Sequence, residues 1–135
     1  MFFPISTLTV CALSALLLVL SFRVIGTRQS RGVSLGDGED EMLQRRIRAQ
    51  GNLVEYAPFA MVLVLCAELQ IVTPGSMIFT LLLSVTAAAF VLGRVLHGYA
   101  LSFTKQNARL RILGMQLTIF AMIGLVFLNL AALVM

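Results

Sequence analysis

The sequence predicts an all-α membrane protein, a bundle of four transmembrane helices, from its composition and from the length of its apolar runs. Hydrophobic residues make up 59% of the 135 residues and charged residues only 12%, whereas a soluble domain is about half apolar and about a quarter charged. A globule of this size must cover itself with polar surface, so the bilayer is the expected solvent. The apolar residues also gather in four runs, each near the ~20 residues that cross a ~30 Å hydrocarbon core.

The four apolar runs cover about 5–26, 53–72, 77–93 and 112–135. The first run has neither a basic start nor a small-residue cleavage site, so we interpret it as a retained helix and not as a signal peptide. The helical pattern of the second run begins earlier, near Glu41, and that of the third continues beyond His97. We therefore predict one domain, residues 1–135, with helices at about 5–26, 41–72, 77–103 and 109–134.

The connections between these helices differ in charge. Residues 27–44 form a polar loop with both charge signs, residues 73–76 a tight uncharged turn, and residues 104–108 a short polar turn. All ten Arg and Lys side chains lie around the first and third connections. With four helices these two connections share a side, which the positive-inside rule places in the cytoplasm, with both termini outside. Orientation in the membrane thus accounts for the net charge of +4, and we expect no nucleic-acid partner.

The second predicted helix carries most of the polar chemistry. Five of its side chains fall within an arc of about 100°, namely Arg45, Arg48, Asn52, Glu55 and Tyr56. A carboxylate in the bilayer costs a few kcal/mol and needs a partner, which Arg48 or an arginine of another helix, such as Arg94, can supply. The stripe is either a set of interfacial anchors with an internal ion pair or the lining of a site for an extended, zwitterionic or anionic ligand. The second buried polar group, Asn52, favours the site.

Other polar residues stand out in the remaining helices. Arg94 and His97 share a face of the third helix, and Arg109 and Arg111 place positive charge at the start of the fourth, near the stripe. A lone histidine without a ligand cluster predicts no metal site. Further side chains are expected to serve packing and contacts: Glu68 at an interface or subunit contact, Asn129 in an interhelical hydrogen bond, and Cys11 and Cys66 as small core residues.

The segment from Arg45 to Pro58, RRIRAQGNLVEYAP, resembles the MAPEG family, the membrane-associated proteins in eicosanoid and glutathione metabolism. Gly93–His97 and the Arg109/Arg111 region support the match, and helix count, length and topology agree across essentially the whole chain. The chain looks most like the short bacterial branch that resembles microsomal glutathione S-transferases. The resemblance implies a trimer of four-helix subunits, with glutathione bound between neighbouring subunits near the cytoplasmic face. Together with the charge distribution, it leads us to expect a protein of the bacterial inner membrane with both termini periplasmic.

The resemblance also implies roles for individual residues. Those matched to glutathione binding are Arg48, Asn52, Glu55 and Tyr56, with Gln50 facing a subunit boundary, Arg28 gripping a glutathione carboxylate, and Arg94 and His97 in the pocket. Either Arg109 or Arg111 matches the catalytic arginine that stabilises the thiolate, and the register between the last two helices leaves both open. Several family enzymes have a tyrosine four residues after the position of His97, where this chain has Leu101. Gln29 stands where the eicosanoid synthases carry an arginine, which argues against that specificity.

Three functions follow as hypotheses. The first is a glutathione-dependent transferase or peroxidase that acts on lipophilic electrophiles through an arginine-stabilised thiolate. The second is a non-catalytic membrane protein of the same fold that binds a lipid or another hydrophobic small molecule. The third is a small multidrug exporter, which is also a four-helix chain of similar length, but such exporters depend on an acidic residue in the first helix, and residues 5–26 contain none.

Overall fold

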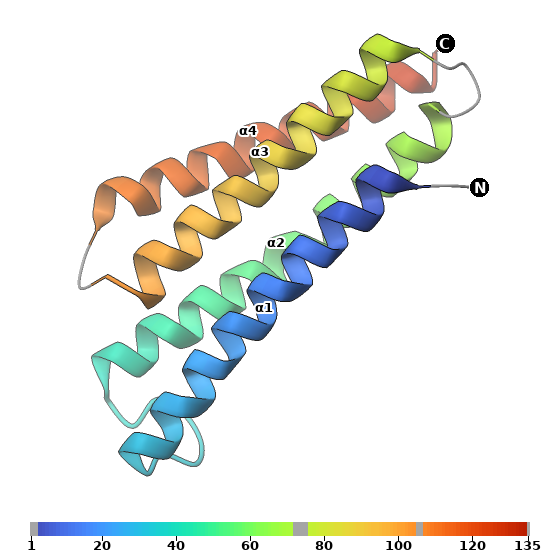
Figure 1. Ribbon diagram of the computed structural model, residues 1–135. Coiled ribbons are helices and arrows are strands. Elements are labelled where there is room, and N and C mark those ends of the chain that lie inside the picture. The colour runs from blue at the N-terminus through green and yellow to red at the C-terminus, as the bar shows by residue number, and fades with distance from the viewer. Residues whose placement is uncertain (1–2, 72–75, 105–106, 135) are drawn as a thin grey trace.

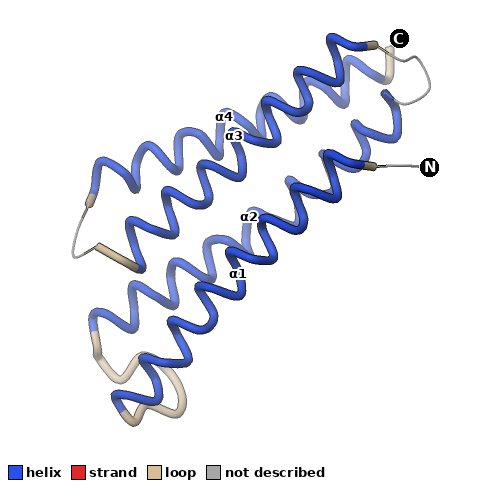
Figure 2. The backbone as a smooth tube through the Cα atoms, viewed as in Figure 1, coloured by secondary structure: helices blue, strands red, loops and turns tan. Residues whose placement is uncertain are grey.

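A computed structural model describes residues 3–71, 76–104 and 107–134 as a bundle of four long helices lying along one another (Figure 1). The helices are α1 (Pro4–Arg31), α2 (Glu41–Ile71), α3 (Met77–Ser102) and α4 (Ala108–Ala132). In this described part of the chain every regular element is helical (Figure 2). The four predicted helices are confirmed. Most of the turn predicted at 73–76 and the centre of the turn predicted at 104–108 lie outside the described residues.

The end of α1 was predicted too early, near residue 26. The helix continues through the polar residues 27–31 and closes at Gly32, whose φ of 68° is left-handed, with Val33 N–H donating to the Arg28 carbonyl at 3.0 Å. Glycine takes this conformation without the steric cost that a Cβ atom brings. Polarity alone suggested a loop, but no residue before Gly32 breaks a helix.

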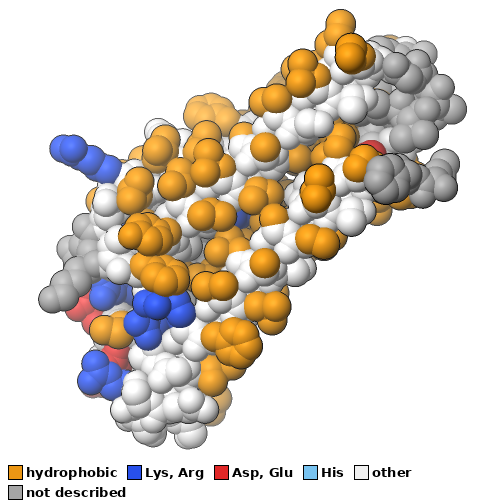
Figure 3. Space-filling view, in the orientation of Figure 1, with side chains coloured by type: hydrophobic (Ala, Val, Ile, Leu, Met, Phe, Trp, Pro, Cys, Tyr) orange, Lys and Arg blue, Asp and Glu red, His pale blue; other side chains and the backbone are white. Residues whose placement is uncertain are grey.

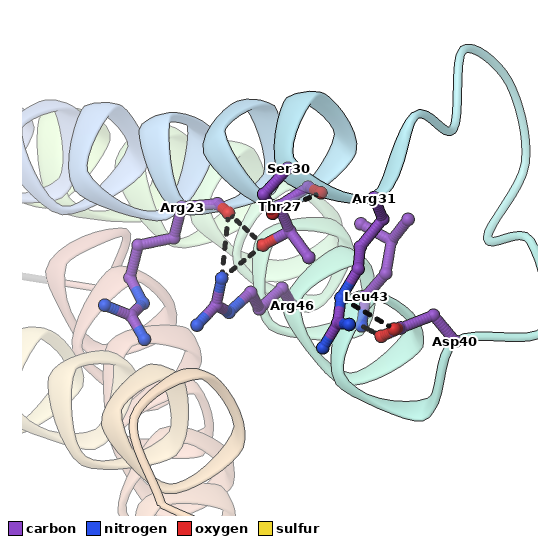
Figure 4. A network of polar contacts seen from close by, with 7 residues as sticks. All are labelled: Arg23, Thr27, Ser30, Arg31, Asp40, Leu43 and Arg46. Atoms are coloured by element: carbon purple, nitrogen blue, oxygen red, sulfur yellow. Dashed lines mark hydrogen bonds and ion pairs between the residues drawn. The ribbon is translucent and has the colours of Figure 1, made fainter.

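Side chains at the helix starts satisfy backbone N–H groups that have no partner within the helix. Asp40 Oδ1 accepts from Leu43 N–H at 2.8 Å at the start of α2, and Asp40 Oδ2 lies 3.2 Å from Arg31 Nε at the end of α1 (Figure 4). One carboxylate thus joins the two ends of the first connection. Ser76 caps α3 and Asn107 caps α4 in the same manner.

Glu68 of α2 caps the start of α1, and its prediction as an interfacial or subunit-contact residue was wrong. Its side chain is 4% exposed. The carboxylate accepts from Ile5 N–H at 2.9 Å, from Ser6 N–H at 2.8 Å and from Ser6 Oγ at 2.5 Å. A negative group is favourable here because the first N–H groups of a helix carry partial positive charge.

The closest helix pair is α3 and α4, and two glycines permit the approach. A Cβ atom on Gly93 would lie 2.9 Å from the Gly114 carbonyl oxygen, and one on Gly114 would lie 2.7 Å from His97 N. Small residues commonly allow this backbone contact in membrane bundles. At the other end of α4, Asn129 Nδ2 donates to the Leu63 carbonyl of α2 at 3.0 Å, which confirms its predicted interhelical hydrogen bond.

The outer surface of the bundle is apolar, and charge gathers at one end. All four helices are long and apolar enough to cross a membrane. On the face shown in Figure 3, arginine side chains cluster at the end opposite the two termini. We call this the basic end. Cys11 and Cys66 lie on exposed helix surfaces and not in the core as predicted, because apolar side chains in the described residues face outward more often than they are buried.

Candidate functional site

The structure brings four of the predicted site residues together around a cavity of about 400 Å³ at the basic end. They are Arg48 and Asn52 of α2, His97 of α3 and Arg111 of α4. Arg45 and Leu101 also line this cavity. A neighbouring cavity of about 350 Å³ is lined by Arg45, Leu101 and Arg111 as well. The two hollows therefore share part of their lining, where α3 ends and α4 begins.

The charge on the cavity wall is positive. Arg45, Arg48 and Arg111 line it, and among the described lining residues there is no carboxylate. Guanidinium groups bind carboxylates and phosphates through paired, charge-assisted hydrogen bonds. The cavity therefore suits an extended ligand that carries negative groups.

Arg94 lies behind the cavity wall and holds Asn52. Its side chain is 2% exposed. Arg94 Nε donates to Thr118 Oγ1 at 2.9 Å, and its terminal nitrogens donate to Thr118 Oγ1 and to Asn52 Oδ1, each at 2.5 Å. Arg94 was predicted to be a pocket residue that touches the ligand, whereas its hydrogen bonds in the described chain are made to α2 and α4.

This contact fixes the orientation of the Asn52 amide. A guanidinium can only donate hydrogen bonds, so the amide oxygen Oδ1 must face Arg94. The amino group Nδ2 is then the part of Asn52 that can donate to a ligand in the cavity. Asn52 itself is 9% exposed, which restricts its motion further.

His97 connects α3 to the first turn of α4. Its Nδ1 lies 3.3 Å from the carbonyl oxygen of Arg111. Because a carbonyl only accepts, Nδ1 carries the hydrogen in this contact, and Nε2 remains an acceptor in the neutral ring. The contact ties the Arg111 backbone to a histidine that also lines the cavity.

The polar stripe of α2 lies partly inside the bundle and partly on its surface. Asn52 points into the bundle, whereas the side chains of Arg48 and Glu55 are 67% and 53% exposed and pair with each other at 3.7 Å. Glu55 does not line the cavity. Tyr56 is half-buried, with its ring centroid 5.2 Å from Cζ of Arg94. Two partners were predicted for Glu55, and the structure pairs it with Arg48 and not with Arg94.

Three further predicted residues lie away from the cavity in the single chain. Gln50 donates to Ser21 Oγ of α1 at 2.8 Å, so its amide is engaged within the chain. Arg28 lies at the end of α1, and one of its terminal nitrogens is buried without a partner among the described residues. Arg109 is exposed and does not line the cavity, whereas Arg111 does. Of the two arginines at the start of α4, Arg111 is therefore the one placed to contact a ligand in the cavity.

The sequence analysis missed Gln44 and Met115, which line the cavity, and Thr118, which supports the site from behind through Arg94. Thr118 is fully buried, accepts from Arg94, and donates its own hydroxyl to the Gly114 carbonyl at 2.8 Å. The available signal was a small polar residue one turn after a glycine in an otherwise apolar helix. That spacing indicates close helix packing with a polar contact.

Comparison with known sequences gives two results. The sequence profile of the MAPEG family matches residues 6–131. The chain is also 38% identical over 119 residues to Inner membrane protein YecN of Escherichia coli strain K12, covering 87% of this chain and 85% of that protein. The protein of the same name from E. coli O6:H1 strain CFT073 shows the same identity and coverage.

Proposed function

This chain belongs to the MAPEG family, and from that premise we propose that it binds glutathione in the cavity between α2, α3 and α4 and activates its thiol toward lipophilic electrophiles. The observation that supports the proposal most directly is the arrangement of Arg48, Asn52 and Arg111 around one cavity. Glutathione is an extended tripeptide with a net negative charge. A positive cavity with an oriented amide donor matches that chemistry.

The thiol chemistry follows from the charge at the start of α4. A cysteine thiol has a pKa of about 8.5, so little thiolate is present at neutral pH. A guanidinium close to the sulfur favours the anion, and each unit by which the pKa falls corresponds to about 1.4 kcal/mol. We assign this role to Arg111, while Arg48 and Asn52 hold the peptide. The proton released from the thiol leaves to water.

The reaction then depends on the electrophile. In conjugation, the thiolate sulfur forms a bond to an electrophilic carbon, and the leaving group departs with the electron pair of its bond. In peroxide reduction, the sulfur attacks one peroxide oxygen and expels the other as an alkoxide, which takes a proton from water. The chain supplies position and electrostatic stabilisation in both cases. Lipophilic substrates would enter from the bilayer, which the apolar outer surface of the bundle contacts.

A homotrimer is part of the proposal because one chain leaves some polar groups at the basic end without full partners. The Arg48–Glu55 pair lies on the outside of α2 where its apolar run begins, and contact of such a pair with lipid is unfavourable. The buried nitrogen of Arg28 also lacks a partner among the described residues. Neighbouring copies that cover these groups would bring Arg28 and Glu55 to a shared glutathione site. By its relatives' name, we place the protein in the bacterial inner membrane, and by the positive-inside rule we place both termini in the periplasm.

A second candidate function has its own support. Leu101 lines both hollows at the position where several family enzymes carry tyrosine. Tyr99, the nearest phenol along α3, is 49% exposed and stacks on Phe103 with the ring centroids 5.5 Å apart. The cavity wall thus lacks a hydroxyl group at this position. A non-catalytic protein that binds a hydrophobic ligand fits that feature.

One titration separates these functions. Purified protein is titrated with glutathione, with calorimetry to report binding and ultraviolet absorbance to report thiolate. Binding with a thiolate signal in the wild type, weaker binding in Arg48→Ala and loss of the thiolate signal in Arg111→Ala would support the enzyme. Arg109→Ala is the matched control and should retain both signals. Binding without thiolate would favour the non-catalytic protein, and absence of binding would refute the glutathione site.

A further inference from the structure

A second group of arginines lies at the basic end, between α1, α2 and the end of α3, and it is separate from the candidate cavity. Arg23 of α1 donates from Nε to Ser102 Oγ at 2.9 Å and from a terminal nitrogen to the Ser102 carbonyl at 2.7 Å. Its Cζ also lies 3.7 Å from the ring centroid of Phe103. The guanidinium is therefore held in one position by two hydrogen bonds and an aromatic face.

Arg46 of α2 contacts α1 close to Arg23. Its terminal nitrogen donates to the Thr27 hydroxyl and, at 3.4 Å, to the backbone carbonyl of Arg23 (Figure 4). Its Nε is buried without a hydrogen-bond partner among the described residues. The Arg46 guanidinium thus lies against the backbone of Arg23 and retains an unused donor.

Neither of these two charges is neutralised within the described chain. All the acceptors that contact Arg23 and Arg46 are hydroxyl or carbonyl oxygens. The ion pairs found among the described residues are Arg31–Asp40 and Arg48–Glu55. Two adjacent, positioned guanidinium groups without a carboxylate repel each other, and an external anion would relieve that repulsion.

The position of the two arginines along the bundle identifies the kind of anion. Arg23 lies about 28 Å along α1 from Pro4 at the usual helical rise, which is close to the ~30 Å thickness of the hydrocarbon core. Its surroundings are apolar and outward-facing, since Phe22 is 68% and Phe103 45% exposed. We therefore place the Arg23 guanidinium, which adjoins outward-facing apolar side chains near the end of the span, at the level of the lipid headgroups.

We propose that Arg23 and Arg46 form a binding site for the phosphate group of an anionic phospholipid in the leaflet at the basic end. Basic pockets between transmembrane helices are known to bind such headgroups. The acyl chains would run from there along the seam between α1 and α3 toward an apolar groove lined by Leu8, Ala88, Val91 and Val95, which lies nearer the start of α1. The site does not depend on the glutathione proposal.

The test is lipid binding to the full-length protein in an uncharged detergent. Short-chain phosphatidylglycerol is compared with phosphatidylcholine of the same chain length, with native mass spectrometry and the melting temperature as readouts. We expect phosphatidylglycerol to bind more tightly and to raise the melting temperature more. Arg23→Gln and Arg46→Gln should each weaken phosphatidylglycerol binding about fivefold. Arg109→Gln, which removes the same charge from an exposed position at the same end, should not.

Several results would overturn this site. The first is equal binding of phosphatidylglycerol and phosphatidylcholine, and the second is unchanged phosphatidylglycerol binding in both Arg23→Gln and Arg46→Gln. The third is a loss of binding in Arg109→Gln as large as in those two variants. The fourth is equal stabilisation by inorganic phosphate, which would indicate a site for a soluble anion. If Arg23→Gln gives no folded protein, Arg23→Lys retains the charge and loses the planar guanidinium on Phe103. That variant should still prefer phosphatidylglycerol, with an affinity between those of wild type and Arg46→Gln, and loss of the preference would contradict the proposal.

Discussion

Arg94 of α3 donates a 2.5 Å hydrogen bond to Asn52 Oδ1 of α2, and both side chains are buried. The same guanidinium binds Thr118 of α4. One side chain therefore connects the three helices that form the cavity and orients the amide that faces it. Because an arginine in the bilayer is expensive unless it is fully hydrogen-bonded, these contacts should be sensitive to small changes.

The Thr118 hydroxyl provides the first prediction. Thr118→Val keeps the shape of the side chain and removes the oxygen that accepts from Arg94. A buried donor left without a partner costs about 1–3 kcal/mol, so the free energy of unfolding in detergent should fall by that amount, and Thr118→Ser should restore most of it. Thr80→Val, at an exposed threonine of α3, is the control and should change stability by less than about 0.5 kcal/mol. Equal effects at the two positions would contradict the role of Arg94.

The contact between α3 and α4 gives a second prediction. In Gly114→Ala the new Cβ atom would meet His97 N at 2.7 Å and the Gly93 carbonyl at 2.8 Å, both of them backbone atoms. The two helices must separate, so we expect a loss of about 1–3 kcal/mol in stability together with weaker ligand binding at the cavity that His97 lines. Gly51→Ala in α2 has no neighbour within 4 Å and should be neutral or slightly stabilising. Melting temperatures of the two variants provide the measurement, and a stable Gly114→Ala protein would show that the contact is not tight.

Glu68 allows a test of the cap at the opposite end of the bundle. In Glu68→Gln one carboxylate oxygen becomes an NH₂ group, which cannot accept from the backbone of Ile5 or Ser6. The loss of a cap and of a negative charge at a helix start should cost about 1–2 kcal/mol. Hydrogen exchange at the first turn of α1 should also become faster. Glu39→Gln in the exposed first connection serves as the control, and similar exchange in both variants would show that Glu68 does not hold α1.

The sequence was sufficient to predict the four helices and the division between the apolar and basic ends, because both depend on composition along the chain. It also identified Asn129, since an isolated amide in an apolar helix needs a partner. The end of α1 was missed because the polarity of residues 27–31 was interpreted as a loop. A helix that leaves the membrane can remain helical in water until a residue such as Gly32 stops it.

The candidate site was harder to predict because periodicity gives only the relative angles of side chains on one helix. Arg48, Asn52 and Glu55 do lie on neighbouring faces of α2, but the position of α3 determines that Asn52 is buried and Glu55 is not. The same information was missing for Glu68, whose partners lie in α1. The sequence likewise left open which of Arg109 and Arg111 reaches the site, because the length of the connection between α3 and α4 does not fix their register, whereas in the structure Arg111 lines the cavity.

Leu101 provides the sharpest test of catalytic competence. It lines both hollows beside Arg111, so Leu101→Tyr would place a phenol at this wall. A hydroxyl that donates to a bound thiolate adds a charge-assisted hydrogen bond. We expect the ratio of thiolate to thiol to rise about tenfold, the equivalent of about 1.4 kcal/mol. Tyr99→Phe should leave the signal unchanged, because Tyr99 stacks on Phe103 and does not line the cavity. If Leu101→Tyr binds glutathione as tightly as wild type without any gain in thiolate absorbance, the sulfur does not lie beside Leu101, and the assignment of Arg111 as the thiolate-stabilising group loses its geometric basis.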